Sequence, residues 1–411
     1  MSRASQQFFF DGETMKHLRV GIVGAAGQVG LALLNDLNRD GEFSAFGICR
    51  NRVSSARVAS LGLPVRTVQT DNAAQLIDAT RDLDILVNCA LPQYQPSKTS
   101  AANLRLAESL TASCAGKHLL HLSSVAIYGE FLSSRKKLFA CPKPDTIYGG
   151  QKLQMEQLLR KLSKKHSARC TILRVGHVYG PQLRWSEALF DLIKTEGFRL
   201  PFDGQLPSNA VWIKNLIAGI RYALISDSTQ GTLNLVDTPQ SSWREVFDLH
   251  SHACGCPPVA ALDQFESQRS YLNAKKRSEV GIAARFVRET WVWIRSLPAS
   301  YVSSVPTFKA ISQRVVAKIG SERLDSKLYA SYCRHLSRRD DNQSTPTILP
   351  LLLSEPVPGP YLAYEGKSSV DCLAALINWY DAISNPRPIV RRPLLSPRKV
   401  AKTTFESGSL R

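Results

Sequence analysis

The sequence predicts an α/β protein with a doubly wound parallel sheet. Short apolar runs alternate with longer amphipathic patterns through the first half of the chain, as strands joined by crossover helices require. The predicted helices include Ala101 to Cys114 and Gln151 to Leu162. The predicted strands are Leu18 to Val23, Ala45 to Cys49, Ile85 to Cys89, His118 to Leu122, Cys170 to Val175 and Thr232 to Val236.

A glycine-rich run joins the first predicted strand to the first predicted helix. It reads Gly24-Ala25-Ala26-Gly27-Gln28-Val29-Gly30 and opens an apolar helical pattern that reaches Leu37. In this context the glycines let the backbone approach a pyrophosphate, and the helix N-terminus offers it unpaired N–H groups. The run predicts a dinucleotide site with contacts from Gly24, Ala26, Gly27, Gln28, Val29 and Gly30.

Three residues further along have the chemistry of a hydride-transfer site. Tyr148 and Lys152 lie four apart in a predicted helix and therefore share one helical face. A phenol has an unperturbed pKa of about 10, and a neighbouring cation favours its ionised form. Ser124 follows the apolar run His118 to Leu122, so a parallel sheet would deliver its hydroxyl to the catalytic edge.

These motifs, in this order, resemble an extended short-chain dehydrogenase/reductase of the NAD-dependent epimerase/dehydratase group. The likeness runs from about Lys16 to about Leu249 and implies a Rossmann-type fold. The motifs that carry it are the glycine run, Ser123-Ser124-Val125-Ala126-Ile127-Tyr128-Gly129, Tyr148xxxLys152 and Leu173-Arg174-Val175-Gly176-His177-Val178-Tyr179-Gly180-Pro181.

The resemblance implies a role for each catalytic residue. Ser124 would orient the substrate oxygen, and Tyr148 would act as the acid and base. Lys152 would bind the nicotinamide ribose and lower the pKa of Tyr148, so both residues are also expected cofactor contacts. Asn103 matches the helix asparagine that completes the family's catalytic tetrad.

The end of the second predicted strand bears on the choice of cofactor. Sites for NAD usually place a carboxylate there, whereas sites for NADP use an arginine for the 2′-phosphate. This strand ends in Ile48-Cys49-Arg50-Asn51-Arg52, without a carboxylate. NADP(H) is therefore favoured over NAD(H), with Arg50 as the first candidate and Arg52 as the second. The expected cofactor residues here are Arg50, Asn51, Arg52 and, by the resemblance, Asp71 and Ala90.

The residues after Ser124 narrow the reaction type. Sugar dehydratases of the family carry an Asp-Glu pair there, because the elimination of water needs an extra acid and base. This chain has Val125-Ala126 instead, which leaves epimerisation or ketone/alcohol redox. Arg50 favours net reduction by NADPH, and Val125 is expected beside the substrate together with Ser124.

The substrate side departs from the nucleotide-sugar members of the family. His177 stands where they carry an asparagine, and the stretch Pro207 to Ile213 lacks the arginine that grips a diphosphate. Arg184 is the candidate phosphate ligand, and His177 is a candidate pocket residue. We expect an oxidoreductase or epimerase acting at a sugar carbinol or ketone carbon of a nucleotide-activated sugar. A reductase of a non-sugar ketone or alcohol and a non-catalytic NADP-binding scaffold are the alternatives.

The expected organisation is a flexible leader over residues 1–15 and a Rossmann domain over 16–250, with 182–209 contributed to the substrate side. A divergent, mostly helical substrate region over 251–385 and a disordered basic tail over 386–411 follow. Residues 269–340 hold 15 Lys and Arg against 5 Asp and Glu, and this surplus of ten supplies over half of the net charge of +18. An amphipathic helical pattern from Phe308 to Ile319 either packs on the core or meets an anionic membrane surface or acidic partner.

The composition of the chain bears on its cellular setting and on metal binding. No run of about 20 apolar residues predicts a transmembrane helix, and nine scattered cysteines favour a reducing, cytoplasmic setting, with peripheral membrane contact through the basic region. The stretch His250 to Cys256 lacks the paired cysteines of a zinc site, so no metal is expected. A small-molecule substrate is expected and a nucleic acid is not, and the resemblance implies a homodimer through the two helices at 101–114 and 151–162.

Overall fold

The computed structural model describes residues 17–129 (without 94, 96 and 97), 142, 144, 146–270 (without 227 and 228), 362 and 369–384. Its centre is a seven-stranded, all-parallel sheet with the order β3-β2-β1-β4-β5-β6-β9. The strands are β1 Leu18–Val23, β2 Phe43–Cys49, β3 Val65–Thr67, β4 Ile85–Asn88, β5 His118–Ser124, β6 Arg169–Val175 and β9 Gly231–Leu235.

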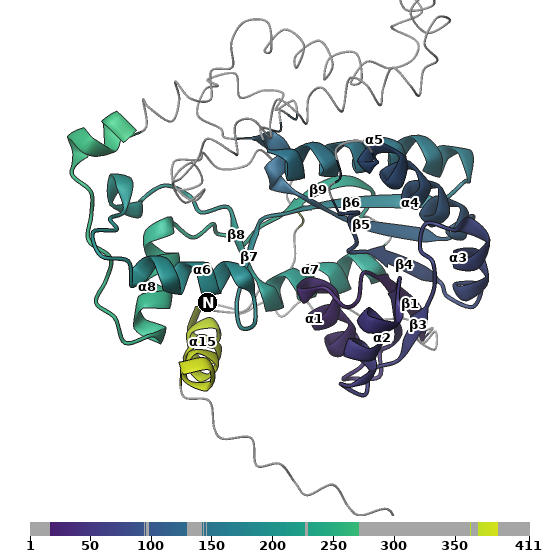
Figure 1. Cartoon of the computed structure of the whole chain (residues 1–411), viewed down its shortest axis with the longest axis horizontal. Helices are drawn as coiled ribbons and strands as arrows, with labels where there is room; N and C mark the ends of the chain where they lie inside the picture. Colours follow the sequence, from purple (N-terminus) through teal and green to yellow (C-terminus); the bar gives the residue numbers. More distant parts are fainter. Residues whose placement is uncertain are drawn as a thin grey trace, which may run out of the picture.

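Helices cover both faces of this sheet (Figure 1). One face carries α1 Gln28–Leu37, α2 Arg52–Ala59 and α7 Ile213–Ile225. The other carries α3 Ala73–Ala79, α4 Thr99–Ser113 and α5 Ile147–Lys165. The central strands β4 and β5 are buried almost throughout, because helices exclude water from both of their faces.

Side-chain caps define where several helices begin. A side-chain oxygen of the preceding residue accepts a backbone N–H of the first turn at Asn51 before α2, Asn72 before α3 and Thr146 before α5. Ser242 and Glu245 form a complete capping box at α8 Trp243–Ala253. Such caps satisfy donors that a helix terminus otherwise leaves unpaired.

A smaller layer extends from the carboxyl edge of the sheet. It contains the two-stranded parallel sheet of β7 His177–Tyr179 and β8 Ala210–Trp212, with α6 Arg184–Ile193, the 3₁₀ turn η2 Pro201–Gly204 and α8. The segment 182–209 contributes α6 and η2 to this layer, and its assignment to a substrate side stays a prediction. Residues 210–225 belong to both layers. Their first part, β8, pairs with β7 in the smaller layer, and their second part, α7, packs against α1 on the main sheet.

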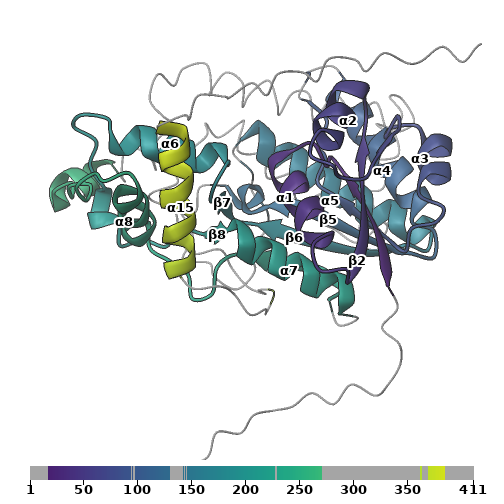
Figure 2. The ribbon, with the colours of Figure 1, turned by 90° about the horizontal axis from the view of Figure 1, so that it is seen from below.

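The C-terminal part of the chain returns to this layer. The backbone N–H of Leu362 donates to the carbonyl of Asn234 (2.8 Å), at the free edge of β9. Helix α15 Ser369–Ser384 then packs along α8 and beside α6 (Figure 2), and it buries Cys372, Leu376 and Trp379 in the main core. Residues more than a hundred positions beyond the Rossmann sheet therefore complete the core of the smaller layer.

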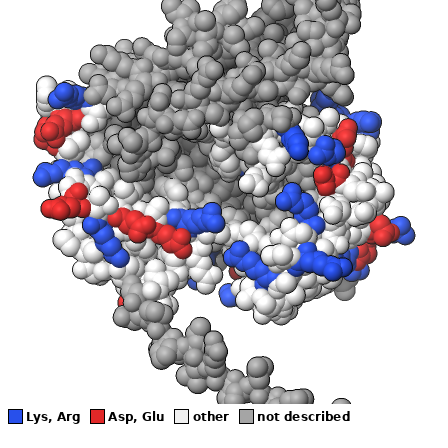
Figure 3. Space-filling model, viewed as in Figure 1, with Lys and Arg blue, Asp and Glu red and all other residues white. Residues whose placement is uncertain are grey.

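The predicted fold class is confirmed, and all six predicted strands are present within two residues of their expected ends. The sequence did not indicate β3, β7 and β8, each of three residues. The expected leader, the amphipathic pattern Phe308 to Ile319 and the basic tail lie outside the described residues, and the domain boundary at residue 250 stays a prediction. None of the described helices is long and apolar enough to cross a membrane. Where Figure 3 shows the described surface, acidic and basic side chains are interspersed.

Candidate active site

The glycine run forms a tight strand-to-helix connection. β1 ends at Val23, and Gly27 is the N-cap of α1. A Cβ atom on Gly30 would lie 2.5 Å from the carbonyl oxygen of Gly24, so only glycine lets the helix approach the strand this closely. The N-terminus of α1 therefore opens directly onto the carboxyl edge of the sheet, which is the phosphate-binding geometry of doubly wound folds.

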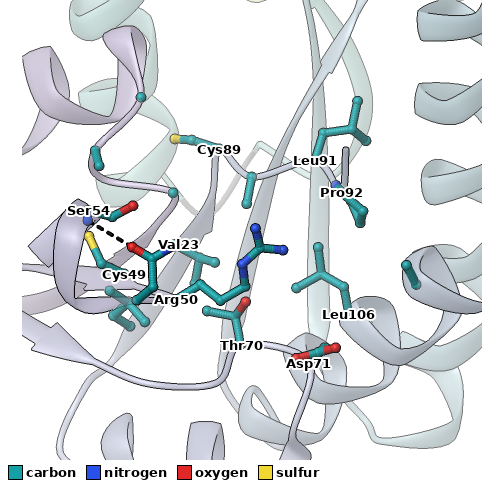
Figure 4. A pocket seen from close by; sticks show the side chains of 17 residues that line it. Val23, Cys49, Arg50, Ser54, Thr70, Asp71, Cys89, Leu91, Pro92 and Leu106 are labelled. Atoms are coloured by element: carbon teal, nitrogen blue, oxygen red, sulfur yellow. Dashed lines mark hydrogen bonds between the residues drawn. The ribbon is translucent and has the colours of Figure 1, made fainter. Parts of the chain in front are cut away.

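A cavity of about 400 Å³ lies at this edge, outside the ends of β1, β2 and β4 (Figure 4). Seven of the expected cofactor residues line it, namely Gly24, Ala26, Gly27, Arg50, Asn51, Asp71 and Ala90. Gln28, Val29, Gly30, Arg52, Tyr148 and Lys152 are not in its lining. Lining residues that sequence reasoning missed are Cys49, Ser54, Thr70, Cys89, Leu91, Pro92, Ala102 and Leu106. Cys49 ends β2, and Cys89, Leu91 and Pro92 come from the segment after β4, so their place at a strand end is the signal that would have identified them.

The side chains at the end of β2 have different surroundings. Arg50 points into the cavity, across from Asp71 (Figure 4). The side chain of Asn51 accepts the backbone N–H of Ser54 (2.9 Å) and so caps α2. Asp71 pairs with Arg105, with 3.5 Å between Oδ2 and Nε. Arg50 is thus the cation that the cavity offers to a ligand, whereas Arg52 is the exposed first residue of α2.

The three expected catalytic residues belong to the end of β5 and to the start of α5, which packs against the turn after β5. Ser124 is the last residue of this strand, and its Oγ accepts the backbone N–H of Ala126 (3.2 Å). Lys152 is buried, and its Nζ donates to the carbonyl of Leu122 (2.6 Å) in the same strand. The same Nζ lies 5.8 Å from the ring centroid of Tyr148. Tyr148 is 47% exposed, and its hydroxyl bonds to no other side chain in the described part of the chain.

Asn103 connects the two helices behind this group. It is fully buried on α4, and its Nδ2 donates to Oε1 of Gln154 on α5 (2.7 Å). Gln154 donates in turn to Ser100 (2.8 Å). The Oδ1 atom of Asn103 has no partner among the described residues. The structure therefore places Asn103 against α5, the helix that carries Tyr148 and Lys152, without a direct bond to either.

Comparison with known proteins assigns the family. Residues 20–195 match the model of the NAD dependent epimerase/dehydratase family. This segment, which is less than half of the chain, is similar to that family. The predicted family, and with it the prediction of an NAD(P)-dependent enzyme of the extended short-chain dehydrogenase/reductase type, is confirmed. No curated protein matches the chain.

Among solved structures, the chain is similar to UDP-N-acetylglucosamine 4-epimerase from Bacillus cereus, with 20% identity and a TM-score of 0.45 over 62% of this chain and 91% of that one. It is similar to UDP-glucuronic acid 4-epimerase from Bacillus cereus in complex with NAD, with 21% identity and a TM-score of 0.48 over 60% and 87%. A putative epimerase from Burkholderia cenocepacia gives 20% identity and a TM-score of 0.48 over 60% and 84%.

A buried carboxylate, that of Glu156, binds the side chain of Ser123, the residue before the expected catalytic Ser124. Glu156, one helical turn after Lys152, accepts from Ser123 Oγ (2.6 Å) and from Arg160 (2.6 Å), and it pairs with Arg174 (2.9 Å). Arg174 also donates to the hydroxyl of Tyr128 (2.8 Å). Burial alone would raise the pKa of Glu156, but the hydrogen bonds and charges of these partners outweigh it and lower the pKa. The sequence analysis missed this network, which joins α5 to β5 and β6.

A second buried pair supports the cavity wall. Asn88 Nδ2 donates to Nδ1 of His121 (3.0 Å), and Asn88 Oδ1 accepts the backbone N–H of Ala90 (3.0 Å). Burial, together with the positive charge of Lys152, holds the pKa of His121 well below its ordinary value. His121 is therefore a neutral ring at neutral pH, and it orders the turn that carries Ala90 past the cavity.

The expected substrate residues Val125, His177 and Arg184 belong to three different elements. Val125 is buried in the 3₁₀ turn η1 Val125–Tyr128, in a small apolar cluster with Ile127 and Leu153. Arg184 is exposed at the first position of α6. His177 begins β7 and stacks on Trp185, with ring centroids 5.4 Å apart and an interplanar angle of 7°.

The stretch from His250 to Cys256 forms the last turn of α8 and the residues after it. His250 Nε2 accepts from Ser186 Oγ (2.9 Å), because its Nδ1 donates to the carbonyl of Val246 (2.8 Å). The described part of the chain contains no cluster of three or more His, Cys, Asp or Glu that could hold a metal.

Proposed function

We propose that the chain is an NAD(P)-dependent oxidoreductase or epimerase that acts at a carbinol or ketone carbon, with Tyr148 as the acid and base. One observation carries the proposal: the buried Lys152, 5.8 Å from the ring centroid of Tyr148, donates to the carbonyl of Leu122 in β5, the strand that ends in Ser124 at the same sheet edge as the cavity. A protein that only senses a dinucleotide has no need of a phenol beside a buried lysine, which argues against the non-catalytic alternative.

The residues fit a nicotinamide dinucleotide. The close approach at Gly30 opens the N-terminus of α1 toward the pyrophosphate, and Arg50 faces the adenosine end of the cavity. Val23, Gly24 and Ala90 would border the middle of the cofactor. When bound, the nicotinamide would supply or accept the hydride at the substrate carbon.

The protein's own groups would manage the proton. In the direction of reduction, the Tyr148 hydroxyl donates a proton to the substrate oxygen as negative charge develops on it. The Ser124 hydroxyl, at the strand end, donates a hydrogen bond to the same oxygen. The ammonium group of Lys152, 5.8 Å from the Tyr148 ring centroid, stabilises the phenolate that remains. Oxidation uses the same groups in reverse.

The proton-transfer role is tested with Tyr148→Phe. The exposed ring is kept and only the hydroxyl is lost, so we expect an unchanged affinity for the cofactor and a turnover about 10² to 10⁴ times lower. Tyr222→Phe, which removes an exposed hydroxyl from α7, is the matched control. Undiminished turnover in Tyr148→Phe would remove Tyr148 from the mechanism.

The preference for NADP(H) over NAD(H) rests on Arg50. Its side chain points into the cavity, whereas Arg52, two residues later, does not line it. The only carboxylate among the described lining residues, that of Asp71, pairs with Arg105. Calorimetric titration with NADPH, NADP, NADH and NAD should show a preference for the phosphorylated pair that is lost in Arg50→Ala and kept in Arg52→Ala. A preference for NAD(H) in the unmodified protein would refute the proposed specificity for NADP(H).

Two substrate classes come into question. The family resemblance favours a nucleotide-activated sugar, for which Arg184 is the candidate phosphate ligand. The aromatic side chains of His177 and Trp185 favour the other class, a non-sugar ketone or alcohol. The homodimer through α4 and α5, the anionic or acidic partner of the basic region and the cytoplasmic setting stay predictions.

A further inference from the structure

A pair of aromatic rings lies next to the catalytic edge and is not used by the chemistry proposed so far. His177 and Trp185, here called the aromatic pair, are nearly parallel and are both only partly buried. The fully buried Trp243 packs against both of them, at 6.1 Å from the His177 centroid and 5.5 Å from the Trp185 centroid. The pair is therefore held rigidly from behind, while part of its surface stays open.

The strand register places the aromatic pair on the substrate side. Ser124 is the partner of Val175 in the β5–β6 register, so their side chains point to the same face of the sheet. The chain continues through Gly176, whose N–H still bonds to β9 at Leu235 (3.0 Å). His177 is two residues beyond Val175, so its backbone lies about 7 Å past the end of β6 along an extended chain, at the same carboxyl edge of the sheet as Ser124.

Gly176 permits this path. A Cβ atom at that position would lie 2.2 Å from the carbonyl oxygen of Asn209. The N–H of His177 donates to that same carbonyl (2.9 Å). The start of β7, and with it the position of the His177 ring, is thus set by backbone bonds on both sides.

The polar atoms of the aromatic pair are open to a ligand. Neither ring nitrogen of His177 and no indole N–H of Trp185 takes part in a hydrogen bond with the described residues, and neither residue is among those with buried, unpaired polar atoms. Burial lowers the pKa of His177 to about 4, so the ring is neutral at neutral pH. The pair offers flat apolar faces and neutral hydrogen-bonding groups, and it offers no charge to a diphosphate.

We infer that His177 and Trp185 determine substrate specificity, and that the substrate is a neutral cyclic ketone or alcohol whose ring lies against the aromatic pair. The inference rests on the proposed redox function and names the substrate class of the same site. A stacked ring contributes about 0.5–1.5 kcal/mol beyond the area that it buries. This contact would hold the reacting carbon in front of Ser124 and Tyr148 without phosphate ligands.

Two neighbouring residues of α6 give a matched test. If the ring contact determines binding, Trp185 matters and Arg184 does not. If a diphosphate is held instead, the exposed Arg184 matters and Trp185 does not. The full chain, saturated with NADP, which cannot reduce a ketone, is titrated calorimetrically with 2-decalone as a neutral two-ring ketone and with UDP-glucose as a diphosphate probe.

We expect 2-decalone to bind, and its Kd to rise about tenfold in Trp185→Leu while staying within twofold in Arg184→Ala. His177→Asn should also weaken the binding of 2-decalone. It provides a second variant if Trp185→Leu disturbs the fold. UDP-glucose should bind at least tenfold more weakly than 2-decalone. Absence of 2-decalone binding, or binding indifferent to both aromatic substitutions, would overturn the inference.

The failure of this inference is separable from the failure of the proposed function. NADPH binding together with turnover of UDP-glucose that depends on Tyr148 and Arg184 would keep the redox function and overturn the neutral substrate. Absence of any dinucleotide binding would overturn the redox function itself, whatever the two probes do.

Discussion

The proposed cofactor side and the proposed substrate side of the molecule, called the cofactor side and the substrate side below, are built in different ways. The cofactor side, formed by β1, β2, β4 and the starts of α1 and α2, depends on residues close together in sequence, such as Gly24, Gly27 and Gly30. The substrate side, formed by β7, β8, α6, α8 and α15, depends on distant segments, as the 5.7 Å contact between the rings of Phe190 and Trp379 shows. The structure of the cofactor side can therefore be predicted from local sequence motifs. The structure of the substrate side depends on packing between segments that are far apart in the sequence.

The largest effect on stability is expected from the Glu156 network, which connects α5 to the sheet between the two sides. Glu156→Ala leaves the buried Arg174 without its carboxylate, and removing one partner of a buried pair costs about 3–5 kcal/mol. Urea unfolding measures this loss in the free energy of unfolding. Arg81→Ala, which breaks the exposed pair with Asp78, is the control and should change stability by less than about 1 kcal/mol. Equal losses in the free energy of unfolding for the two substitutions would show that the Glu156 network does not stabilise the contact between α5 and the sheet.

A substitution in α15 should separate the two sides. Leu376 is fully buried in the main core, and its replacement by Ala should cost about 2–5 kcal/mol. Ile383 on the same helix is 49% exposed, so Ile383→Ala should be nearly neutral. We expect Leu376→Ala to weaken substrate binding more than NADPH binding in parallel calorimetric titrations. A selective loss of NADPH binding would contradict the division into two sides.

The two sides also differ in how far sequence reasoning reached. The glycine run and the strand ends predicted the sheet and its first helix, because each depends on a local pattern. The spacing of Tyr148 and Lys152 predicted that they share a helix, and their catalytic role stays a prediction. The hydrogen bonds of Glu156 and the pair Asn88–His121 were missed, since a buried polar residue gives no local sign of its partners. The packing of α15 was missed because the sequence of a helix gives no local sign of which distant helices it contacts.

The cofactor side should respond to a change at Gly30 alone. Gly30→Ala forces a methyl group to within 2.5 Å of the Gly24 carbonyl oxygen, and such overpacking costs about 1–3 kcal/mol. The turn that faces the pyrophosphate must shift, so the Kd for NADPH should rise at least about tenfold. Asn35→Ala, an exposed change on the same helix, provides the comparison. An unaltered Kd in Gly30→Ala would argue that α1 does not bind the pyrophosphate.

The substrate side should carry a distinct dependence of stability on pH. Burial lowers the pKa of His250 to about 4 in the folded state, against an ordinary value of 6.5. Between these values the unfolded state binds more protons, so the free energy of unfolding falls as pH falls, by up to about 1.4 kcal/mol per pH unit. Urea unfolding from pH 7 to 4.5 should show a shallower slope in His250→Gln. An identical slope in both proteins would mean that His250 does not titrate on unfolding.

The smallest effect is expected at a contact between the two sides. Gln28, in the glycine run, donates through Nε2 to the carbonyl of Gln182 (2.8 Å), two residues before α6 begins. The bond is exposed, so Gln28→Ala should cost no more than about 1 kcal/mol of stability. Because it ties the loop before Arg184 and Trp185 to the cofactor-binding helix, its loss should reduce the gain in substrate affinity that bound NADPH provides. Calorimetric titration of substrate with and without NADPH measures that gain. If the gain is the same in Gln28→Ala as in the unmodified protein, the two sides are coupled through the sheet and the network of Glu156, and the Gln28 bond only orders a surface loop.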